Sequence, residues 1–214
     1  MVSNVVFLSA CSLRAFVRAG ICVMSLAFAG SAIADADIEN GRVLADTCKG
    51  CHAVESYNNV YPTYHVPRIG GQSVEYLEAA LKLYRSGDRP HPTMQAQAAA
   101  YSDAEIRDIA AYLASVVEPL AKDTPAVGAA PAAALVCSSC HGVRGVGAIA
   151  SYPYLAGQHK DYLQHSLGAY KAGKRKGVNG TIMQAQVMNL SEQDIADISA
   201  FYAAQSGLTA LPMD

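Results

Sequence analysis

A five-residue string that occurs twice constrains this chain more than any other feature. The copies read Cys48-Lys49-Gly50-Cys51-His52 and Cys137-Ser138-Ser139-Cys140-His141. Two residues between the cysteines place both thiols on one helical turn, and the histidine follows directly. This spacing is typical of haem c attachment, in which the thiols bond the porphyrin vinyl groups and the imidazole binds the iron. The sequence therefore predicts two covalently attached haem c groups.

The similarity between the two halves of the chain extends beyond these strings. The second string begins 89 residues after the first, and residues 67–72 and 153–158 share a Pro-x-x-Gly/Ala-Gly-Gln pattern. A Tyr-Leu pair, a later tyrosine, a Gly-x-Arg and a Met-Gln-Ala-Gln sequence then recur in the same order. We interpret the chain as a duplication with four parts: a signal peptide at 1–34, a haem domain at 35–122, a linker at 123–134 and a second haem domain at 135–214.

The first 34 residues have the pattern of an export signal. Arg14 and Arg18 precede an uncharged run that ends in the cleavage pattern Ala32-Ile33-Ala34. That run of 16 residues is shorter than the roughly 20 that a membrane-spanning helix needs. We expect cleavage before Asp35; the alternative is an uncleaved anchor.

The composition after the leader excludes some classes of partner. Four cysteines remain and all belong to the haem strings, so no thiol is left for disulfide bonds. The remaining charges are 14 basic and 18 acidic residues, which is not the balance of a nucleic-acid-binding protein. We expect membrane association only through a partner or an uncleaved leader.

The rest of the pattern is helical, and we expect an all-α fold without strands. Residues 74–84 place apolar side chains on one helical face, and Gly87 is positioned to end that helix. Capping-box sequences at 102–105 and 191–194 each precede a further apolar stripe. Residues 118–134 are rich in Ala, Pro and Gly, which is typical of a linker.

A haem iron bound by one histidine needs a second axial ligand or keeps an open site, and we expect methionine here. Met94 is the only methionine in 35–122, in what we expect to be a loop, and the repeat places Met183 opposite it. Thioether ligation raises the reduction potential and suits electron transfer; the alternative is that both methionines fill gaps in the core. The other histidines lack a repeat partner and are expected at the surface or in packing: His65, His91, His159 and His165.

Two further pairs of repeated residues are candidates for supporting the haem groups. The carbonyls of Pro67 and Pro153 are placed to accept the second ring N–H of each ligating histidine, which would orient the ring; the alternative is a turn proline. We expect Arg89 and Arg175 either to pair with haem propionates or to lie at solvated helix ends.

Paired Cys-x-x-Cys sequences also occur in zinc sites with four cysteine ligands. The two pairs of such a site are about 15–20 residues apart, much closer than the pairs in this chain. A zinc site would also leave the histidine after each pair unexplained. The sequence therefore disfavours zinc.

Together these residues resemble the cytochrome c4 family of periplasmic dihaem proteins. The resemblance spans essentially the whole chain after the leader. It rests on the haem strings, the Pro-x-x-Gly/Ala-Gly-Gln segments, the Tyr-Leu helix ending in Gly-x-Arg, and the methionine followed by a capped helix. It implies two tandem class I cytochrome c domains, and axial pairs His52/Met94 and His141/Met183. Dihaem cytochrome subunits of flavocytochrome c sulfide dehydrogenases are also similar in size and pattern.

The expected function is a periplasmic electron carrier that is not an enzyme. The resemblance implies that it passes electrons from a quinol-oxidising complex or a dehydrogenase to a terminal oxidase. One alternative is the electron-accepting subunit of a periplasmic flavoprotein dehydrogenase. Another is a dihaem peroxidase, which would need one iron with an open position. The Tyr-rich insert at 57–65 and the basic cluster at 171–176 have no counterpart in the other half, so we expect any partner preference there.

Overall fold

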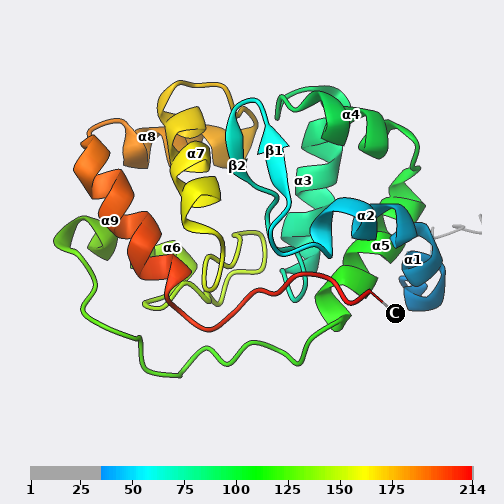
Figure 1. The fold of residues 1–214 in the computed structure, drawn as a ribbon, viewed down its shortest axis with the longest axis horizontal. Helices are drawn as coiled ribbons and strands as arrows, with labels where there is room; N and C mark the ends of the chain where they lie inside the picture. The colour runs from blue at the N-terminus through cyan, green and yellow to red at the C-terminus, as the bar shows by residue number, and fades with distance from the viewer. Residues whose placement is uncertain (1–34, 214) are drawn as a thin grey trace, which may run out of the picture. The chain divides into compact units, whose positions relative to one another are not determined.

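The computed structural model describes residues 35–213, and the predicted signal peptide lies outside the described residues. Figure 1 shows two groups of helices that follow one another along the chain. We call them the first half and the second half. The first half contains α1 (Ile38–Leu44), α2 (Asp46–His52), α3 (Val74–Ser86), α4 (Pro92–Ala99) and α5 (Asp103–Ser115). The second half contains the 3-10 turn η1 (Ala132–Ala134), α6 (Leu135–His141), α7 (Lys160–Lys171), α8 (Val178–Val187) and α9 (Glu192–Ala203).

The ends of several helices confirm the predictions made from local sequence. Helix α3 ends at Gly87, whose φ of 83° lies in the left-handed region that glycine adopts without a steric penalty. Helices α5 and α9 begin with capping boxes at Ser102 and Ser191, in which the hydroxyl and the third residue's carboxylate satisfy free backbone N–H groups. These signals act within a few residues of the chain, so the sequence alone reveals them.

Each half has its own apolar core, built mainly between its first long helix and its last. In the first half α3 packs on α5, and α1 crosses α5 closely. That crossing requires Gly41, because a Cβ there would lie 2.0 Å from the carbonyl oxygen of Asp108. In the second half α7 packs on α9, where Leu163, Ile198 and Tyr202 are buried.

Two local expectations were wrong. The insert of the first half contains a two-stranded antiparallel hairpin, β1 (Asn58–Val60) and β2 (Thr63–His65), although no strand was expected. Three-residue strands are too short to show the alternation by which a strand is recognised. Met94 lies within α4 and not in a loop, because Pro92 takes the first helical position, where its missing N–H costs nothing.

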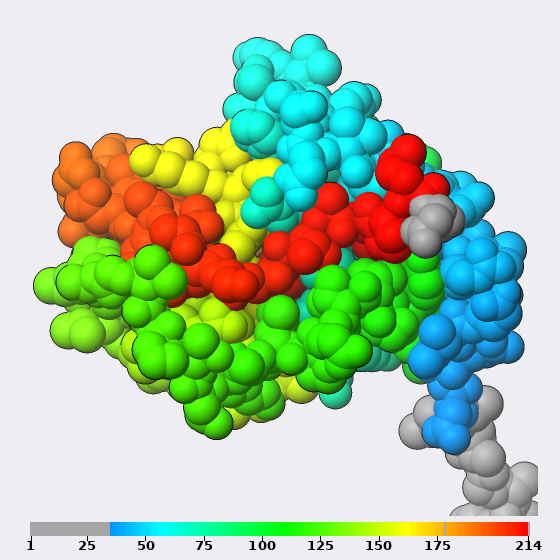
Figure 2. All heavy atoms as spheres, turned by 60° about the horizontal axis from the view of Figure 1, so that its bottom comes forward, coloured from blue at the N-terminus to red at the C-terminus, as the bar shows by residue number. Residues whose placement is uncertain are grey.

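Several segments of the two halves are in contact. Strand β2 packs against α7 (Figure 1). The segment that leads into the linker passes beside Arg144, whose guanidinium donates to the carbonyls of Ala121 and Ser206. The C-terminal segment, red in Figure 2, runs from the second half back to the first half, where Leu211 enters the core. Within residues 35–213, no helix is long and apolar enough to cross a membrane.

Candidate functional site

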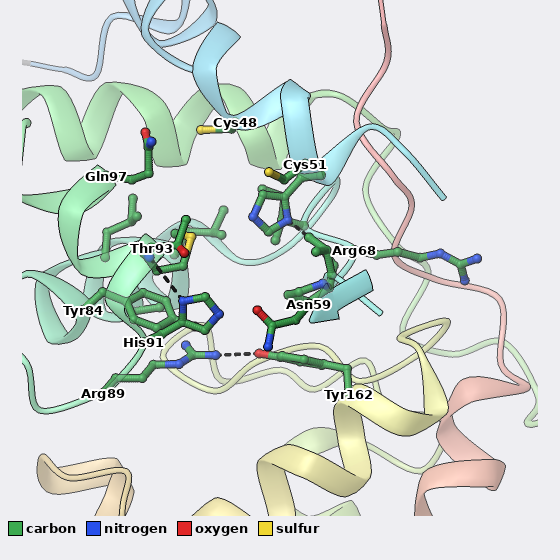
Figure 3. A pocket seen from close by; sticks show the side chains of 18 of the residues that line it. Cys48, Cys51, Asn59, Arg68, Tyr84, Arg89, His91, Thr93, Gln97 and Tyr162 are labelled. Atoms are coloured by element: carbon green, nitrogen blue, oxygen red, sulfur yellow. Dashed lines mark hydrogen bonds between the residues drawn. The ribbon is translucent and has the colours of Figure 1, made fainter. Parts of the chain in front are cut away.

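A cavity of about 480 Å³ opens in the first half around the first haem string. Its wall includes Cys48, Cys51 and His52 of α2, and Met94 of α4. The structure thus brings together all four residues that the sequence predicts for the first haem. In Figure 3 the two cysteines lie at one end of the cavity, and Arg89 and Tyr162 at the other. The wall also includes Leu77 of α3, Leu113 of α5 and Asn58 of the hairpin.

The imidazole of His52 is held by a backbone carbonyl. Its Nδ1 lies 2.7 Å from the carbonyl oxygen of Pro67, and a carbonyl can only accept, so Nδ1 carries the proton. Burial lowers the pKa of His52, which favours the neutral ring. The other nitrogen, Nε2, is therefore left with a lone pair available to a metal.

The second half repeats this arrangement. Cys137 and Cys140 lie on α6, and His141 at its end is buried. Its Nδ1 donates to the carbonyl oxygen of Pro153 over 2.9 Å, and burial lowers its pKa. Met183 lies on α8, which follows α7 as α4 follows α3, and is partly buried.

Arg89 is buried and Arg175 is partly buried, so neither lies at a solvated helix end, which corrects one of the two expectations for them. Arg89 is only 7% exposed and stacks over the ring of Tyr84, and Arg175 stacks in the same way over Tyr170. Both guanidinium groups donate to the hydroxyl of Tyr76, and Arg89 also donates to Tyr162. The two positive charges together lower the pKa of Tyr76 to about 8, against the opposing effect of its burial.

No carboxylate compensates these two charges. Neither Arg89 nor Arg175 takes part in any ion pair within the described residues. A buried guanidinium without a carboxylate partner is costly, so the site favours an anionic group. A porphyrin with its propionates supplies two such groups together with a flat apolar body.

The four remaining histidines are partly buried and pack against neighbouring groups. This agrees with the packing role that was one of the two expected for them. His65 donates through Nδ1 to Asp161 at 2.7 Å and stacks on His159, while His165 stacks on Tyr64 with ring centres 4.2 Å apart. His91 accepts the backbone N–H of Met94 at the start of α4 and lines the cavity.

Sequence reasoning missed several residues of the cavity wall. Asn59 comes from the hairpin, Thr93 and Gln97 come from α4, and Tyr162 reaches in from the other half of the chain (Figure 3). The repeat of Tyr76 and Tyr162 was visible in the sequence, but nothing local shows that a residue of the second half borders the first cavity.

The residues present fit a haem and not a zinc ion. The cavity is within the range of about 300–1,000 Å³ that is usual for cofactor sites, with thiols at one end, the buried guanidinium of Arg89 at the other and an oriented imidazole. Across residues 35–213, no three His, Cys, Asp or Glu side chains are grouped so as to hold a metal ion by themselves.

Comparison with known proteins agrees with this fit. The cytochrome c family model matches residues 38–116 and again 126–204. Cytochrome c4 of Pseudomonas aeruginosa is 31% identical over 191 residues, which cover 84% of this chain and 94% of the relative. A protein of Stutzerimonas stutzeri named thiosulfate dehydrogenase electron acceptor is 31% identical over 175 residues, covering 74% of this chain and 79% of the relative. The crystal structure of reduced cytochrome c4 from Pseudomonas stutzeri matches with a TM-score of 0.60 and 28% identity, covering 81% of this chain and all of that one.

These matches confirm the predicted fold of two tandem cytochrome c domains and the two haem c groups. They agree with the structure, in which each half presents the same cysteines, histidine and proline carbonyl. The chain belongs to the cytochrome c family and, within it, to the dihaem cytochrome c4 proteins, which transfer electrons.

Proposed function

We propose that this chain carries electrons between protein partners in the periplasm, and that its two irons are ligated by His52 with Met94 and by His141 with Met183. The observation that carries the proposal is the first cavity, whose wall contains both predicted ligands and both attachment cysteines. Haem c, when bound, supplies a one-electron couple between ferrous and ferric iron.

The chain's own residues hold and tune that group. The two cysteines of each string would attach one haem covalently. The carbonyls of Pro67 and Pro153 hold a proton on Nδ1 of each histidine, which fixes the ring and raises the basicity of Nε2. Arg89 and Arg175 would neutralise propionates, and the apolar wall would exclude water. Two protein ligands on each iron would leave no position for a substrate, so we propose no enzymatic activity and disfavour a peroxidase.

Replacement of each methionine tests the ligand assignment. Met94→Ala should abolish the sulfur-to-iron charge-transfer band of one haem and lower one of the two midpoint potentials, because the soft thioether stabilises ferrous iron. Met183→Ala should do the same to the other haem. Spectroelectrochemical titration of the intact protein measures both changes.

Exposed Met188 on the second half provides the matched control, since it is 58% exposed. Met188→Ala should leave both bands and both potentials unchanged. If Met94→Ala and Met183→Ala also leave them unchanged, the methionines are not ligands.

A second candidate is the electron-accepting partner of a periplasmic dehydrogenase. It is favoured by the relative named thiosulfate dehydrogenase electron acceptor, which this chain matches over 79% of that protein's length. As a free carrier, the chain passes electrons from a quinol-oxidising complex or a dehydrogenase to a terminal oxidase. Purification from its source discriminates the two, because only the second candidate predicts a stoichiometric dehydrogenase partner.

A further inference from the structure

A glutamine from each half reaches across to the other half and binds the backbone there. Gln72 donates through Nε2 to the carbonyl of Tyr154 (3.0 Å) and accepts through Oε1 from the N–H of Tyr154 (2.8 Å). Gln158 does the same to Arg68, with distances of 2.8 and 2.9 Å. The pairs are reciprocal, because Gln72 and Gln158 are repeat partners, and so are Arg68 and Tyr154.

These contacts fall on the peptide groups that orient the two histidines. The N–H of Arg68 and the carbonyl of Pro67 belong to one peptide group. Its carbonyl accepts a hydrogen bond from Nδ1–H of His52, and its N–H donates to Oε1 of Gln158 in the second half. In the same way, the Pro153–Tyr154 peptide accepts from His141 and donates to Gln72 of the first half.

A peptide group that donates at one end becomes a better acceptor at the other, because hydrogen bonds in a chain polarise one another. Both glutamines are nearly inaccessible to water, with exposures of 4% and 5%. The low local dielectric strengthens such a chain. A stronger bond at Nδ1 makes the imidazole more basic toward a metal at Nε2.

We propose that Gln72 and Gln158 are positioning residues that act crosswise: each tunes the axial histidine of the haem in the opposite half. The proposal rests on the proposed function in taking His52 and His141 as iron ligands. It means that the midpoint potential of each haem is set partly by the half of the molecule that does not bind it.

Leucine variants of the whole haem-loaded protein test the crossed pattern. Gln158→Leu should raise the potential of the first haem, because a less basic histidine stabilises ferric iron less, and leave the second unchanged. Gln72→Leu should raise only the second. Mutation of a group that hydrogen-bonds directly to a metal ligand typically changes metal affinity or activity 10–100-fold. The glutamines are one group further from the iron, so we expect a change of about threefold in the redox equilibrium. At 59 mV per tenfold for one electron, threefold is about 28 mV.

Each glutamine also serves its own half, which supplies the competing outcome. Oε1 of Gln72 accepts from the N–H of Ser73 at the start of α3, and Oε1 of Gln158 accepts from His159 at the start of α7. If that local role dominated, each leucine variant would shift the midpoint potential of the haem in its own half. An own-half shift, an equal shift of both haems or no shift overturns the proposal.

The two haems are told apart by repeating the titrations in the Met94→Ala and Met183→Ala backgrounds. A glutamate variant supplies the rescue: Gln158→Glu keeps an acceptor for the N–H of Arg68, so the first potential should stay at or below the wild-type value. A rise equal to that of the leucine variant overturns the proposal. Should a leucine variant fail to assemble, Gln→Met, which is unbranched and of similar length, is measured in its place.

A magnetic resonance readout separates this proposal from the ligand assignment. The Nδ1 proton of His52 should shift upfield and exchange faster with solvent in Gln158→Leu, and not in Gln72→Leu. This result does not depend on which residue is the second ligand. An unchanged Nδ1 proton contradicts the hydrogen-bond chain, whereas unchanged potentials in the methionine variants contradict the ligand assignment.

Discussion

Histidine has two different roles among the residues of this protein. His52 and His141 each follow a cysteine pair and donate to a proline carbonyl, so their role follows from the sequence string and its repeat. His165 has no repeat partner, and only the structure shows that it stacks on Tyr64 between the two halves. Burial lowers the pKa of His165, and the nearby Arg175 acts in the same direction.

This lowered pKa predicts a pH dependence of stability. Because the folded pKa lies below the unfolded value, the unfolded state binds more protons in this range. The stabilisation from His165 is therefore present above the unfolded pKa of about 6.5 and is lost as the pH falls through the folded pKa. His165→Phe keeps a ring against Tyr64 and should reduce the loss of unfolding free energy between pH 7.5 and 5.5, as measured by denaturant titration.

The matched control for His165 is its stacking partner. Tyr64→Phe keeps the aromatic contact and removes no group that titrates between pH 5.5 and 7.5. Its pH dependence should therefore equal that of the wild type. A His165→Phe protein with the wild-type pH dependence would show that this histidine contributes nothing to it.

Among the structural elements, the C-terminal segment departs most from what the repeat suggests. By sequence it belongs to the second half, yet its backbone N–H groups serve both. The N–H of Leu208 donates to Ala156 of the second half, whereas those of Thr209 and Leu211 donate to Gly70 and His52 of the first. The segment therefore joins the two loops that carry the histidine-orienting prolines.

Leu211 makes this segment part of the first core, where it is 3% exposed. Leu211→Ala should lower the free energy of unfolding by about 2–5 kcal/mol, the usual cost of deleting a buried leucine side chain. Met213→Ala is the control, because Met213 is 73% exposed and should cost close to nothing. Guanidinium titration measures both; equal effects would mean that Leu211 does not belong to the core.

From the sequence, the hairpin and the basic cluster are expected to determine which partners the protein prefers. The hairpin docks one side on α7 through Tyr64, while Val60 and Tyr61 at its turn are 85% and 94% exposed. The basic cluster is smaller than its sequence suggests. Arg175 donates to the hydroxyl of Tyr76 and stacks over Tyr170, and Lys171 donates to the carbonyl of Leu190. Lys174 and Lys176 are the members of the cluster that remain exposed.

At the scale of the whole molecule, many contacts join the two halves, so we do not expect either half to be stable without the other. Leu211, the glutamine pairs and the contact of β2 with α7 all link residues of one half to the backbone or core of the other. Loss of one half would leave buried polar groups of the other without partners, which is costly.

We therefore expect the protein to unfold in one transition. The absorption of the two haems, distinguished by their potentials, should be perturbed at the same guanidinium concentration, and circular dichroism should follow the same curve. Leu211→Ala should shift the whole curve and not split it. Two separate transitions would show that the halves are stable alone.

The sequence by itself determined the parts that depend on short-range chemistry or on repetition. The haem strings, the capping boxes, the helix ending at Gly87 and the pairing of Met94 with Met183 all follow from residues a few positions apart, or from comparing the halves. Two expectations failed for different reasons: the strands of the hairpin are too short to show a pattern, and Arg89 resembles a solvated helix end when only its neighbours in sequence are considered.

Only the tertiary structure decided what lies between the halves. That Tyr162 borders the first cavity, that Leu211 completes the first core and that each glutamine binds the peptide beside the other half's proline depends on contacts between residues about 70 to 160 positions apart. Such contacts leave no periodic signal in the sequence, because their energy arises only when both surfaces are already folded.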